Sequence, residues 1–471
     1  MHLPTELPPP FVINDEQVEK LLAKQNPKKA AGPDGVSTAT LRSCSKQLAP
    51  ILSDVFNQSL QQGKVPSCFK ASIIVPVPKK SKVSVLNDYR PVALTSVVMK
   101  VFERLVMQFL KNSTDSLSDP MQFAYKTNRS VDDAVTLTLH KLVQHLDTPK
   151  SYARILFLDF SSAFNTIAPQ KLYDKLLGDL HVDELMCRWI LDFLLMRPQV
   201  VRLQGRTSES IILNTGAPQG CVLSPLLFTL FTNDCRSSHE SVVLVKFSDD
   251  TTVSGLISDC DESKYREEVE AMVSWCSENN LILNVSKTKE IIVDFRSKRT
   301  EISTLSINDQ EVEIVDSFKF LGCTISNDLT WDNHVLAVRK KAQQRLYILR
   351  QLKKFRINET ILVQFYRSII ESILTFSMTT WYGSTTQQNR DDLQRVVKWA
   401  SKIIGCEVPS LQSLYDDRLI RKAKSILKDE THPAHHIFQP LPSGKRYRTI
   451  YAKTERARST FFYRAVKAVS M

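Results

Sequence analysis

Residues 242–255 constrain the fold of this chain more than any other stretch. An apolar, β-branched run ends at two adjacent aspartates, Asp249 and Asp250, and a second short β-branched run follows them. This pattern predicts a β-hairpin with the acidic pair at its turn. Neighbouring carboxylates repel each other, so the pair is either a solvated turn or part of a site for a hard divalent cation, which prefers oxygen ligands. A third acid on another apolar strand would favour the cation site.

Residues 155–160 supply such an acid. Their apolar residues run without interruption up to Asp159, and this pattern predicts a strand buried on both faces. An unpaired charge at the end of a buried strand is costly. Because Asp159 lies far from Asp249 in the sequence, their carboxylates can meet only through the fold.

Length and charge narrow the classes of protein that fit. A chain of 471 residues predicts two or three subdomains. The net charge of +12 indicates a polyanionic partner, either nucleic acid or a membrane surface. No apolar run approaches the length of a membrane span. The nine cysteines are scattered without any Cys-x-x-Cys pair, which argues against a zinc module or a disulfide framework and favours a reducing, intracellular compartment.

Two basic segments are candidates for binding phosphate. Residues 71–80 form a β-branched run closed by prolines, which suits an edge strand, and the loop after it bears Lys79, Lys80 and Arg90. That loop could hold a triphosphate or be a solvated basic loop. Residues 332–352 predict a helix with an apolar stripe and a basic opposite face, and residues 334–359 contain eight Lys or Arg against one acid. A solvated helix usually mixes charge signs, so we expect this face to follow a phosphate backbone.

Several motifs, in a fixed order, resemble those of the reverse transcriptases of non-LTR (LINE-type) retrotransposons, and the jockey-like and Rex-like branches are the most similar. The resemblance covers about residues 27–410. The segments that carry it are 29–35, 87–92, 122–130, 158–164, 216–225, 247–250, 283–289 and 320–322.

The resemblance implies an α+β fold of the right-hand polymerase type, with fingers, palm and thumb, an antiparallel palm sheet and a mainly helical thumb. The implied division is a lead-in at 1–26, fingers with an N-terminal extension at 27–154, palm with part of the fingers at 155–325, thumb at 326–410 and a basic C-terminal tail at 411–471.

The implied activity is RNA-directed DNA polymerisation, in which a DNA 3′-hydroxyl is extended with dNTPs on an RNA template. Two Mg²⁺ ions, with Mn²⁺ as the alternative, would assist the phosphoryl transfer. The expected partners are the RNA template, the DNA primer or target and dNTPs, without a membrane. Target-primed synthesis would place the protein in the nucleus, with the cytoplasm as an alternative. The lack of an endonuclease segment before residue 27 leads us to expect a fragment that needs a nick made elsewhere.

The resemblance also implies roles for single residues. Asp159 and Asp249 would hold the ions, with Asp250 as a weaker ligand and the Phe160 carbonyl completing a shell. Lys287, or Lys289 instead, would protonate pyrophosphate. The nucleotide contacts would come from Arg90, Lys79 or Lys80, Gln219 and Phe164, the last as a steric gate against a 2′-hydroxyl. The primer grip would be Phe320, Leu321 and Gly322, and the nucleic-acid contacts of the thumb Arg339, Lys340, Lys341 and Arg345.

Some of these residues have a purely structural alternative, and two motifs differ from the usual family sequence. Phe164 could be a core aromatic and Gln219 a helix cap. Ser248 replaces the usual Ala, and Thr127-Asn128 replaces a usual Pro-Gly. The competing functions are an RNA-dependent RNA polymerase, which Phe164 argues against, and an inert relic that binds RNA, which the presence of all three acids argues against.

Overall fold

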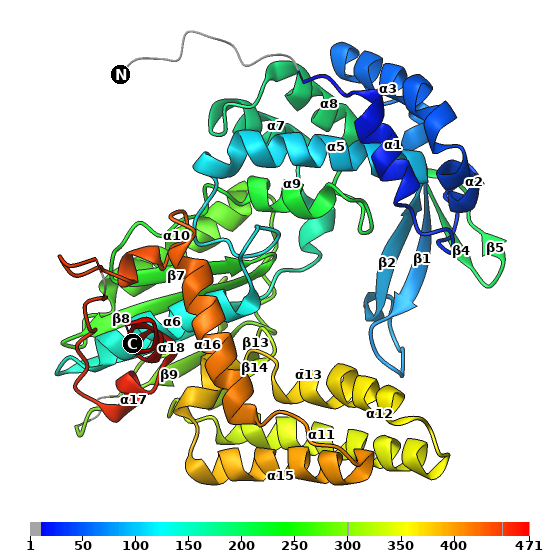
Figure 1. The fold of residues 1–471 in the computed structure, drawn as a ribbon. Coiled ribbons are helices and arrows are strands. Elements are labelled where there is room, and N and C mark those ends of the chain that lie inside the picture. Colours follow the sequence, from blue (N-terminus) through cyan, green and yellow to red (C-terminus); the bar gives the residue numbers. More distant parts are fainter. Residues whose placement is uncertain (1–10, 299–300, 445, 471) are drawn as a thin grey trace. The chain divides into compact units, whose positions relative to one another are not determined.

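The computed structural model describes residues 11–298, 301–444 and 446–470 (Figure 1). Residues 1–10 of the lead-in expected at 1–26 lie outside the described residues. The chain forms two compact units, each assembled from separate stretches of sequence. The first unit comprises Met1–Asp119, Phe160–Cys235 and Trp275–Ile282, and the second comprises Pro120–Asp159, Arg236–Ser274 and Leu283–Met471.

The first unit contains a sheet with the strand order β2-β1-β4-β5, in which β6 also pairs with β4. Its strands are β1 (Ser72–Pro78), β2 (Tyr89–Thr95), β4 (Arg197–Leu203), β5 (Arg206–Thr207) and β6 (Ile211–Leu213). The expectation of an edge strand is wrong for the first half of β1, because residues 72–74 pair with both β2 and β4. Pro76 and Pro78 come after that part, where β1 has only β2 as a partner, so their missing N–H groups are tolerated.

Helices pack around a cluster of aromatic rings in the first unit. Phe56 stacks on Phe102 with ring centroids 4.2 Å apart, and Phe102 meets the edge of Trp189 at 4.8 Å. The apolar spacing of residues 41–62 predicts one helix, but the structure divides this stretch at Cys44 into α2 and α3. The helices are α1 (Asp15–Ala23), α2 (Thr38–Ser43), α3 (Ser45–Gln62), α4 (Ser67–Lys70), η1 (Leu86–Asp88), α5 (Val97–Thr114), η2 (Asp115–Leu117), η3 (Ala163–Thr166), α7 (Pro169–Gly178), α8 (Glu184–Leu194) and α9 (Ser224–Phe231).

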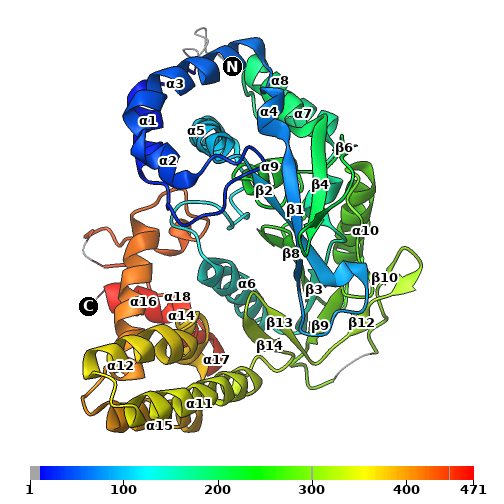
Figure 2. The ribbon, with the colours of Figure 1, turned by 90° about the vertical axis from the view of Figure 1, so that its right-hand side faces the viewer.

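The second unit is built on a sheet with the strand order β12-β9-β3-β8-β7. Its strands are β3 (Ser151–Leu158), β7 (Val242–Phe247), β8 (Asp250–Ser258), β9 (Lys289–Val293) and β12 (Glu313–Ile314), with the separate pairs β10 (Ser306–Ile307) and β11 (Gln310–Glu311), and β13 (Ser317–Phe320) and β14 (Cys323–Ser326). Every residue of β3 is buried, and α6 (Val131–Leu146) packs on β3, β7 and β8 (Figure 2). The predicted buried strand before Asp159 is confirmed, as is the hairpin, in which Phe247 pairs with Asp250.

The described part of the second unit has twelve further helical segments, most of which share one apolar core with the sheet. They are α10 (Ser263–Glu278), whose last turn belongs to the first unit, α11 (Asp332–Lys354), α12 (Glu359–Phe365), the π-helix η4 (Tyr366–Glu371), α13 (Ser372–Leu374), α14 (Met378–Trp381), η5 (Tyr382–Ser384), α15 (Gln387–Ile404), α16 (Leu411–Leu427), η6 (His435–Ile437), α17 (Glu455–Arg458) and α18 (Phe461–Val469). Among the described residues, no helix combines the length and apolar character needed to cross a membrane.

The segment expected to be a basic tail is folded. Tyr415 and Leu419 of α16 are buried in the core of the second unit, as are Phe461 and Phe462 of α18. Tyr415, Phe461 and Phe462 therefore help to pack this segment onto the unit. Helices α11 and α15 lie side by side (Figure 2), because their starts are linked by Asn389 and Asp332 and their ends by Lys353 and the Ile404 carbonyl.

A buried charge network ties the central strand to its neighbours. Arg154 of β3 donates two hydrogen bonds to the carboxylate of Glu290 on β9, at 2.9 and 2.6 Å, and a third to Glu262 at 2.7 Å. The side chains of Arg154 and Glu290 are fully buried. Removing one partner of such a pair leaves an uncompensated charge in the interior.

We therefore predict that Glu290→Ala lowers the free energy of unfolding by about 3–5 kcal/mol. Urea denaturation of the purified chain measures this change. Glu313→Ala is the matched control, because it removes an ion pair with Lys289 in which the Glu313 side chain is 64% exposed, and it should cost less than about 1 kcal/mol. Equal losses for the two variants would contradict the prediction.

Candidate active site

The second unit brings the three predicted acids together at one end of its sheet. Asp159 directly follows β3, Asp249 lies in the two-residue turn between β7 and β8, and Asp250 begins β8. The register pairs Leu158 with Thr251, so the next position of this antiparallel ladder sets Asp159 beside Asp250. The backbone of Asp159 is held from the other side, because its carbonyl accepts a hydrogen bond from the Asn284 N–H at 2.8 Å.

The charges of these acids act on one another. The pKa of Asp250 is raised to about 6, first because the surrounding chain shields its carboxyl and then because of the negative charges of Asp249 and Asp159. Three carboxylates offer the oxygen donors that a hard divalent cation prefers, and such a cation would relieve their repulsion. Within the described parts of the chain, no three acidic, histidine or cysteine side chains already converge as a ligand cluster.

The structure distinguishes the two lysines predicted near the acids. The Lys287 Nζ lies 3.7 Å from the Asp159 Oδ2, and the Lys287 side chain is 64% exposed. The Lys289 Nζ instead binds Glu313 at 2.6 Å and the Ser286 carbonyl at 2.8 Å. Lys287 is therefore the lysine that faces the acidic cluster.

The predicted primer grip is the turn of the β13–β14 hairpin. Phe320 pairs with Cys323, which leaves Leu321 and Gly322 as the two turn residues. Phe320 is buried, with its ring 5.3 Å from that of Phe157. Gly322 has φ +89°, and a Cβ atom there would lie 2.7 Å from the Phe376 ring. The side chain of Phe320 therefore packs in the core. Of the predicted primer grip, Leu321 and Gly322 form the turn of the hairpin.

In the first unit, backbone bonds gather the predicted nucleotide-binding residues. The Phe164 carbonyl accepts a hydrogen bond from the Ala217 N–H at 2.7 Å, and the Gln219 carbonyl accepts one from the Ala93 N–H of β2 at 2.6 Å. A Cβ atom on Gly220 would lie 2.6 Å from the Ala93 carbonyl oxygen, so this close approach requires glycine. The ring centroids of Phe164 and Phe228 are 5.0 Å apart. Phe164 can therefore still be either a core aromatic or the predicted steric gate.

The β1–β2 hairpin places its basic residues differently. Arg90 is exposed and pairs with Val77. The Lys79 N–H continues the ladder by donating to the Asp88 carbonyl, so Lys79 falls on the same face as Arg90. The Lys80 Nζ is bound to the Asp88 carboxylate at 2.8 Å, and this contact holds the pKa of Asp88 well below its usual range. Of the two lysines left open by the sequence, Lys79 is therefore the one on the same face of the hairpin as Arg90.

Glu103 is a residue of this region that the sequence reasoning missed. Its side chain is fully buried on α5, and its Oε2 accepts hydrogen bonds from the N–H groups of Val222 and Leu223 at 2.6 and 2.9 Å. It thereby holds the loop that follows Gln219. Burial raises the pKa of Glu103 to about 7, although the two N–H donors and Arg197 oppose the shift. The available signal was a lone acid among the apolar residues of 97–106.

The predicted basic face lies on α11. Lys340, Lys341 and Arg345 are exposed, whereas Arg339 forms an ion pair with Asp392 of α15. The pair offsets the charge of Arg339, so three of the four predicted contacts, Lys340, Lys341 and Arg345, keep an exposed positive charge.

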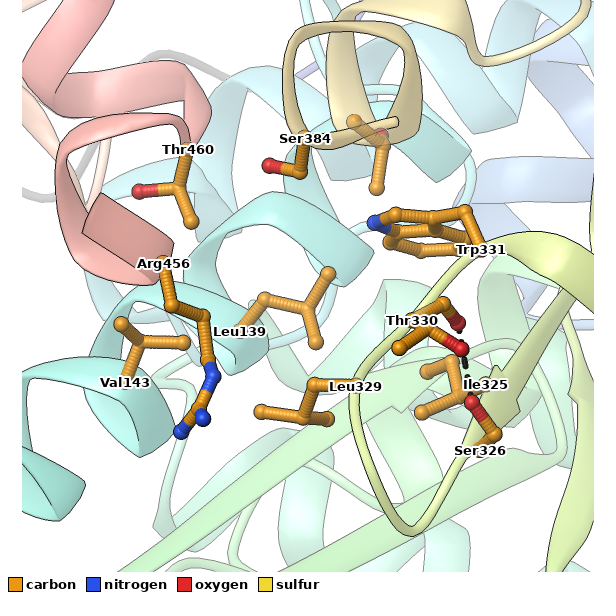
Figure 3. A pocket seen from close by; sticks show the side chains of 11 residues that line it. Leu139, Val143, Ile325, Ser326, Leu329, Thr330, Trp331, Ser384, Arg456 and Thr460 are labelled. Atoms are coloured by element: carbon orange, nitrogen blue, oxygen red, sulfur yellow. Dashed lines mark hydrogen bonds between the residues drawn. The ribbon is translucent and has the colours of Figure 1, made fainter. Parts of the chain in front are cut away.

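A small cavity in the second unit is separate from these residues (Figure 3). Its wall is mainly apolar, with Arg456 at one side and Trp331 at the other. Its volume of about 20 Å³ leaves room for roughly one water molecule. None of the predicted site residues lines it, and we assign it no role in binding a nucleotide.

The buried Glu103 leads to a pH-dependent prediction. Its folded-state pKa of about 7 lies above the ordinary value of 4.5, so the folded state binds more protons between these values and loses stability as the pH rises through this window. Glu103→Gln removes the titration. We therefore expect the parent to be as stable as the variant near pH 5 and less stable near pH 8, by up to about 3 kcal/mol. Thermal unfolding at both pH values measures this, with exposed Glu184→Gln as the control. Parallel curves for parent and Glu103→Gln would contradict it.

Comparisons with known proteins agree with this geometry. The family model described as "Reverse transcriptase (RNA-dependent DNA polymerase)" matches residues 77–325, and one described as "Alkylated DNA repair protein alkB homolog 8, N-terminal" matches residues 331–372. The RNA-directed DNA polymerase from the mobile element jockey of Drosophila melanogaster is 25% identical over 403 residues, which are 82% of this chain and 43% of that protein. The probable RNA-directed DNA polymerase from transposon BS of the same species is 23% identical over 408 residues, 83% of this chain and 44% of that protein.

A solved structure of apo telomerase from Candida tropicalis, truncated from the C-terminal domain, is 14% identical, covers 61% of this chain and 60% of that chain, and has a TM-score of 0.39.

The chain thus spans less than half the length of these curated relatives. The predicted resemblance to the reverse transcriptases of non-LTR retrotransposons is confirmed by the relatives from mobile elements. The first family match covers more than half of the chain, from β1 to β14, and includes all three acids. The chain belongs to the reverse transcriptase (RNA-dependent DNA polymerase) family.

Proposed function

We propose that this chain is an RNA-directed DNA polymerase of a non-LTR retrotransposon, which extends a DNA 3′-hydroxyl on an RNA template. The observation that carries this proposal is the meeting of Asp159, Asp249 and Asp250 at one end of an antiparallel sheet, in a member of the reverse transcriptase family. In-line phosphoryl transfer needs little covalent chemistry from the protein, so positioning and charge neutralisation are its main tasks.

The three carboxylates would hold two Mg²⁺ ions, or Mn²⁺ in their place, with the Phe160 carbonyl as a further ligand. When bound, the ions would neutralise charge on the attacking and leaving oxygens. Asp159 and Asp249 come from two different strand ends, so they can approach an ion from two sides. Lys287, whose Nζ lies 3.7 Å from the Asp159 Oδ2, would donate a proton to the leaving pyrophosphate.

The first unit would supply the contacts to the incoming nucleotide. Arg90 and Lys79 share a face of the β1–β2 hairpin and suit a triphosphate, with Arg as a fork and Lys as a point charge. Gln219 would contact the nucleotide from the loop that Glu103 anchors. The Phe164 ring would exclude a 2′-hydroxyl and so select dNTP over NTP.

The remaining assignments follow the right-hand plan. The sheet of the second unit would be the palm, and α11 to α15 the thumb, whose exposed Lys340, Lys341 and Arg345 would follow the phosphates of an RNA–DNA duplex. The β13–β14 turn would hold the primer end. Helices α16 and α18 pack into the same core as the thumb helices, and we assign them to this body rather than to a separate tail. Target-primed synthesis would take place in the nucleus.

Primer extension tests this proposal. The purified chain, given an RNA template, a DNA primer, dNTPs and Mg²⁺, should extend the primer, and Asp249→Ala should lower the rate by at least about 1,000-fold because it removes a carboxylate that the ions need. Asp391→Ala, an exposed acid on α15, is the control and should retain the parent's rate. A well-folded parent that binds RNA without extending the primer would favour the inert relic.

The steric gate is tested by sugar selection. We expect Phe164→Ala to raise incorporation of NTP relative to dNTP by about 10- to 100-fold, because the smaller side chain leaves room for the 2′-hydroxyl. Single-nucleotide incorporation assays with matched dNTP and NTP measure this ratio. Phe228→Ala is the control, since it removes the ring behind Phe164 without opening the gate itself. An unchanged ratio in Phe164→Ala would refute the gate, and a parent that prefers NTP would favour an RNA-dependent RNA polymerase.

A further inference from the structure

A short extended segment lies against the tip of the acidic hairpin. The Phe123 N–H donates to the Lys246 carbonyl, and the Lys246 N–H donates to the Met121 carbonyl, both at 2.9 Å. This parallel bridge adds the segment to the outer side of β7, just before the turn. The Phe123 side chain is fully buried in the core of the second unit. Residues 121–123 are therefore firmly held beside the end of β7, next to the turn that contains Asp249.

The side chain of Gln122 binds both backbone groups of the first turn residue. Its Oε1 accepts a hydrogen bond from the Ser248 N–H at 3.0 Å, and its Nε2 donates to the Ser248 carbonyl at 3.3 Å. The same Oε1 also accepts from the Ala124 N–H at 3.0 Å. Gln122 is only 2% exposed, so these bonds form away from water. The amide thus links the anchored segment to the residue that precedes Asp249.

Ser248 needs such support because of its backbone conformation. Its φ is +61°, in the left-handed region that a residue with a Cβ atom seldom adopts without help. Two-residue hairpin turns usually place Gly, Asn or Asp at such a position. Here the turn has Ser, and no glycine lies between Phe247 and Asp250. The hydrogen bonds of the Gln122 amide stabilise a turn conformation that glycine would adopt without strain.

A second contact holds the same residue by its side chain. The Tyr125 Oη lies 3.2 Å from the Ser248 Oγ. This bond requires a hydroxyl at position 248, where the resemblance leads one to expect alanine. Tyr125 itself has φ +60° and is 44% exposed. Ser248 is thereby fixed through its N–H, its carbonyl and its hydroxyl.

We propose that Gln122 is a positioning residue for the reaction, which sets the Asp249 and Asp250 carboxylates by clamping the backbone of Ser248, and that Tyr125 reinforces the clamp through the Ser248 hydroxyl. This inference rests on the proposed polymerase function. Groups that orient metal ligands without touching the metal commonly change metal affinity or activity when they are removed. The clamp explains how a turn without glycine keeps two like charges close together.

Gln122→Met tests the clamp, because methionine keeps the length of the side chain but removes both hydrogen-bonding groups. We expect the Mg²⁺ concentration for half-maximal primer extension to rise about tenfold and kcat to fall about 10- to 100-fold. The KM for dNTP should change by less than about twofold, because dNTP contacts are assigned elsewhere. The matched control is Gln25→Met, another buried glutamine, which is 4% exposed and donates to the Leu21 carbonyl. It should leave the Mg²⁺ dependence unchanged even if it lowers the Tm.

Two readouts do not need activity. Hydrogen exchange of the Ser248 amide should be at least about tenfold faster in Gln122→Met, since its acceptor is gone. Binding of Mn²⁺ alone, followed by electron paramagnetic resonance, should weaken about tenfold. If Gln122→Met does not fold, Tyr125→Phe and Ser248→Ala serve instead. Each should raise the half-maximal Mg²⁺ concentration roughly threefold, and the double variant should match the single ones, because both remove the same bond.

The outcomes separate the clamp from the proposed function. A folded Gln122→Met with unchanged amide exchange and unchanged Mn²⁺ affinity would overturn the clamp, whatever the parent's activity. Strictly additive effects of Tyr125→Phe and Ser248→Ala would overturn the role of Tyr125. A parent that extends no primer with Mg²⁺ or Mn²⁺ would overturn the proposed function, and the exchange and Mn²⁺ measurements would still decide the clamp.

Discussion

Repulsion among three carboxylates at one end of a sheet is the constraint on which the second unit depends. The pKa of Asp250 is raised to about 6, first by burial of its carboxyl and then by the negative charges of Asp249 and Asp159. Like charges are held together only by a rigid frame. The frame is β3, which is buried along its whole length and paired on both sides, by β8 and by β9. Hydrogen bonds along both edges of β3 prevent the acids from separating, and Lys287 offsets part of their charge.

Both units use the same device to fix a loop that carries predicted site residues. In each, a buried polar side chain from a distant element binds backbone groups of the loop. Gln122 binds the N–H and carbonyl of Ser248, and Glu103 binds the N–H groups of Val222 and Leu223. A buried polar group left without partners is costly, so each arrangement stabilises the loop and satisfies the side chain at once. This explains why polar residues occur at positions that the apolar pattern would fill with hydrophobic ones.

Not every basic residue of this basic chain is available to a polyanion. Lys80 is bound to Asp88 and Arg339 to Asp392. An internal ion pair removes most of the long-range attraction of a cation for phosphate. The exposed Lys340, Lys341 and Arg345 on α11 keep theirs. The net charge therefore indicates the class of partner, whereas the ion pairs decide which side chains contribute to binding it.

Local patterns in the sequence were enough to predict the acidic hairpin, the buried strand before Asp159 and the long helix α11, because alternation, apolar runs and helical stripes arise from neighbouring residues. The order of the motifs was enough to predict the family. Only the tertiary structure showed that Lys287 rather than Lys289 lies beside Asp159, that Gln122 and Glu103 bind the backbone of loops, and that Tyr415 and Phe461 pack a folded C-terminal segment. Each of these depends on partners far away in the chain. Distant partners are set by strand register and helix packing, which a single sequence does not display.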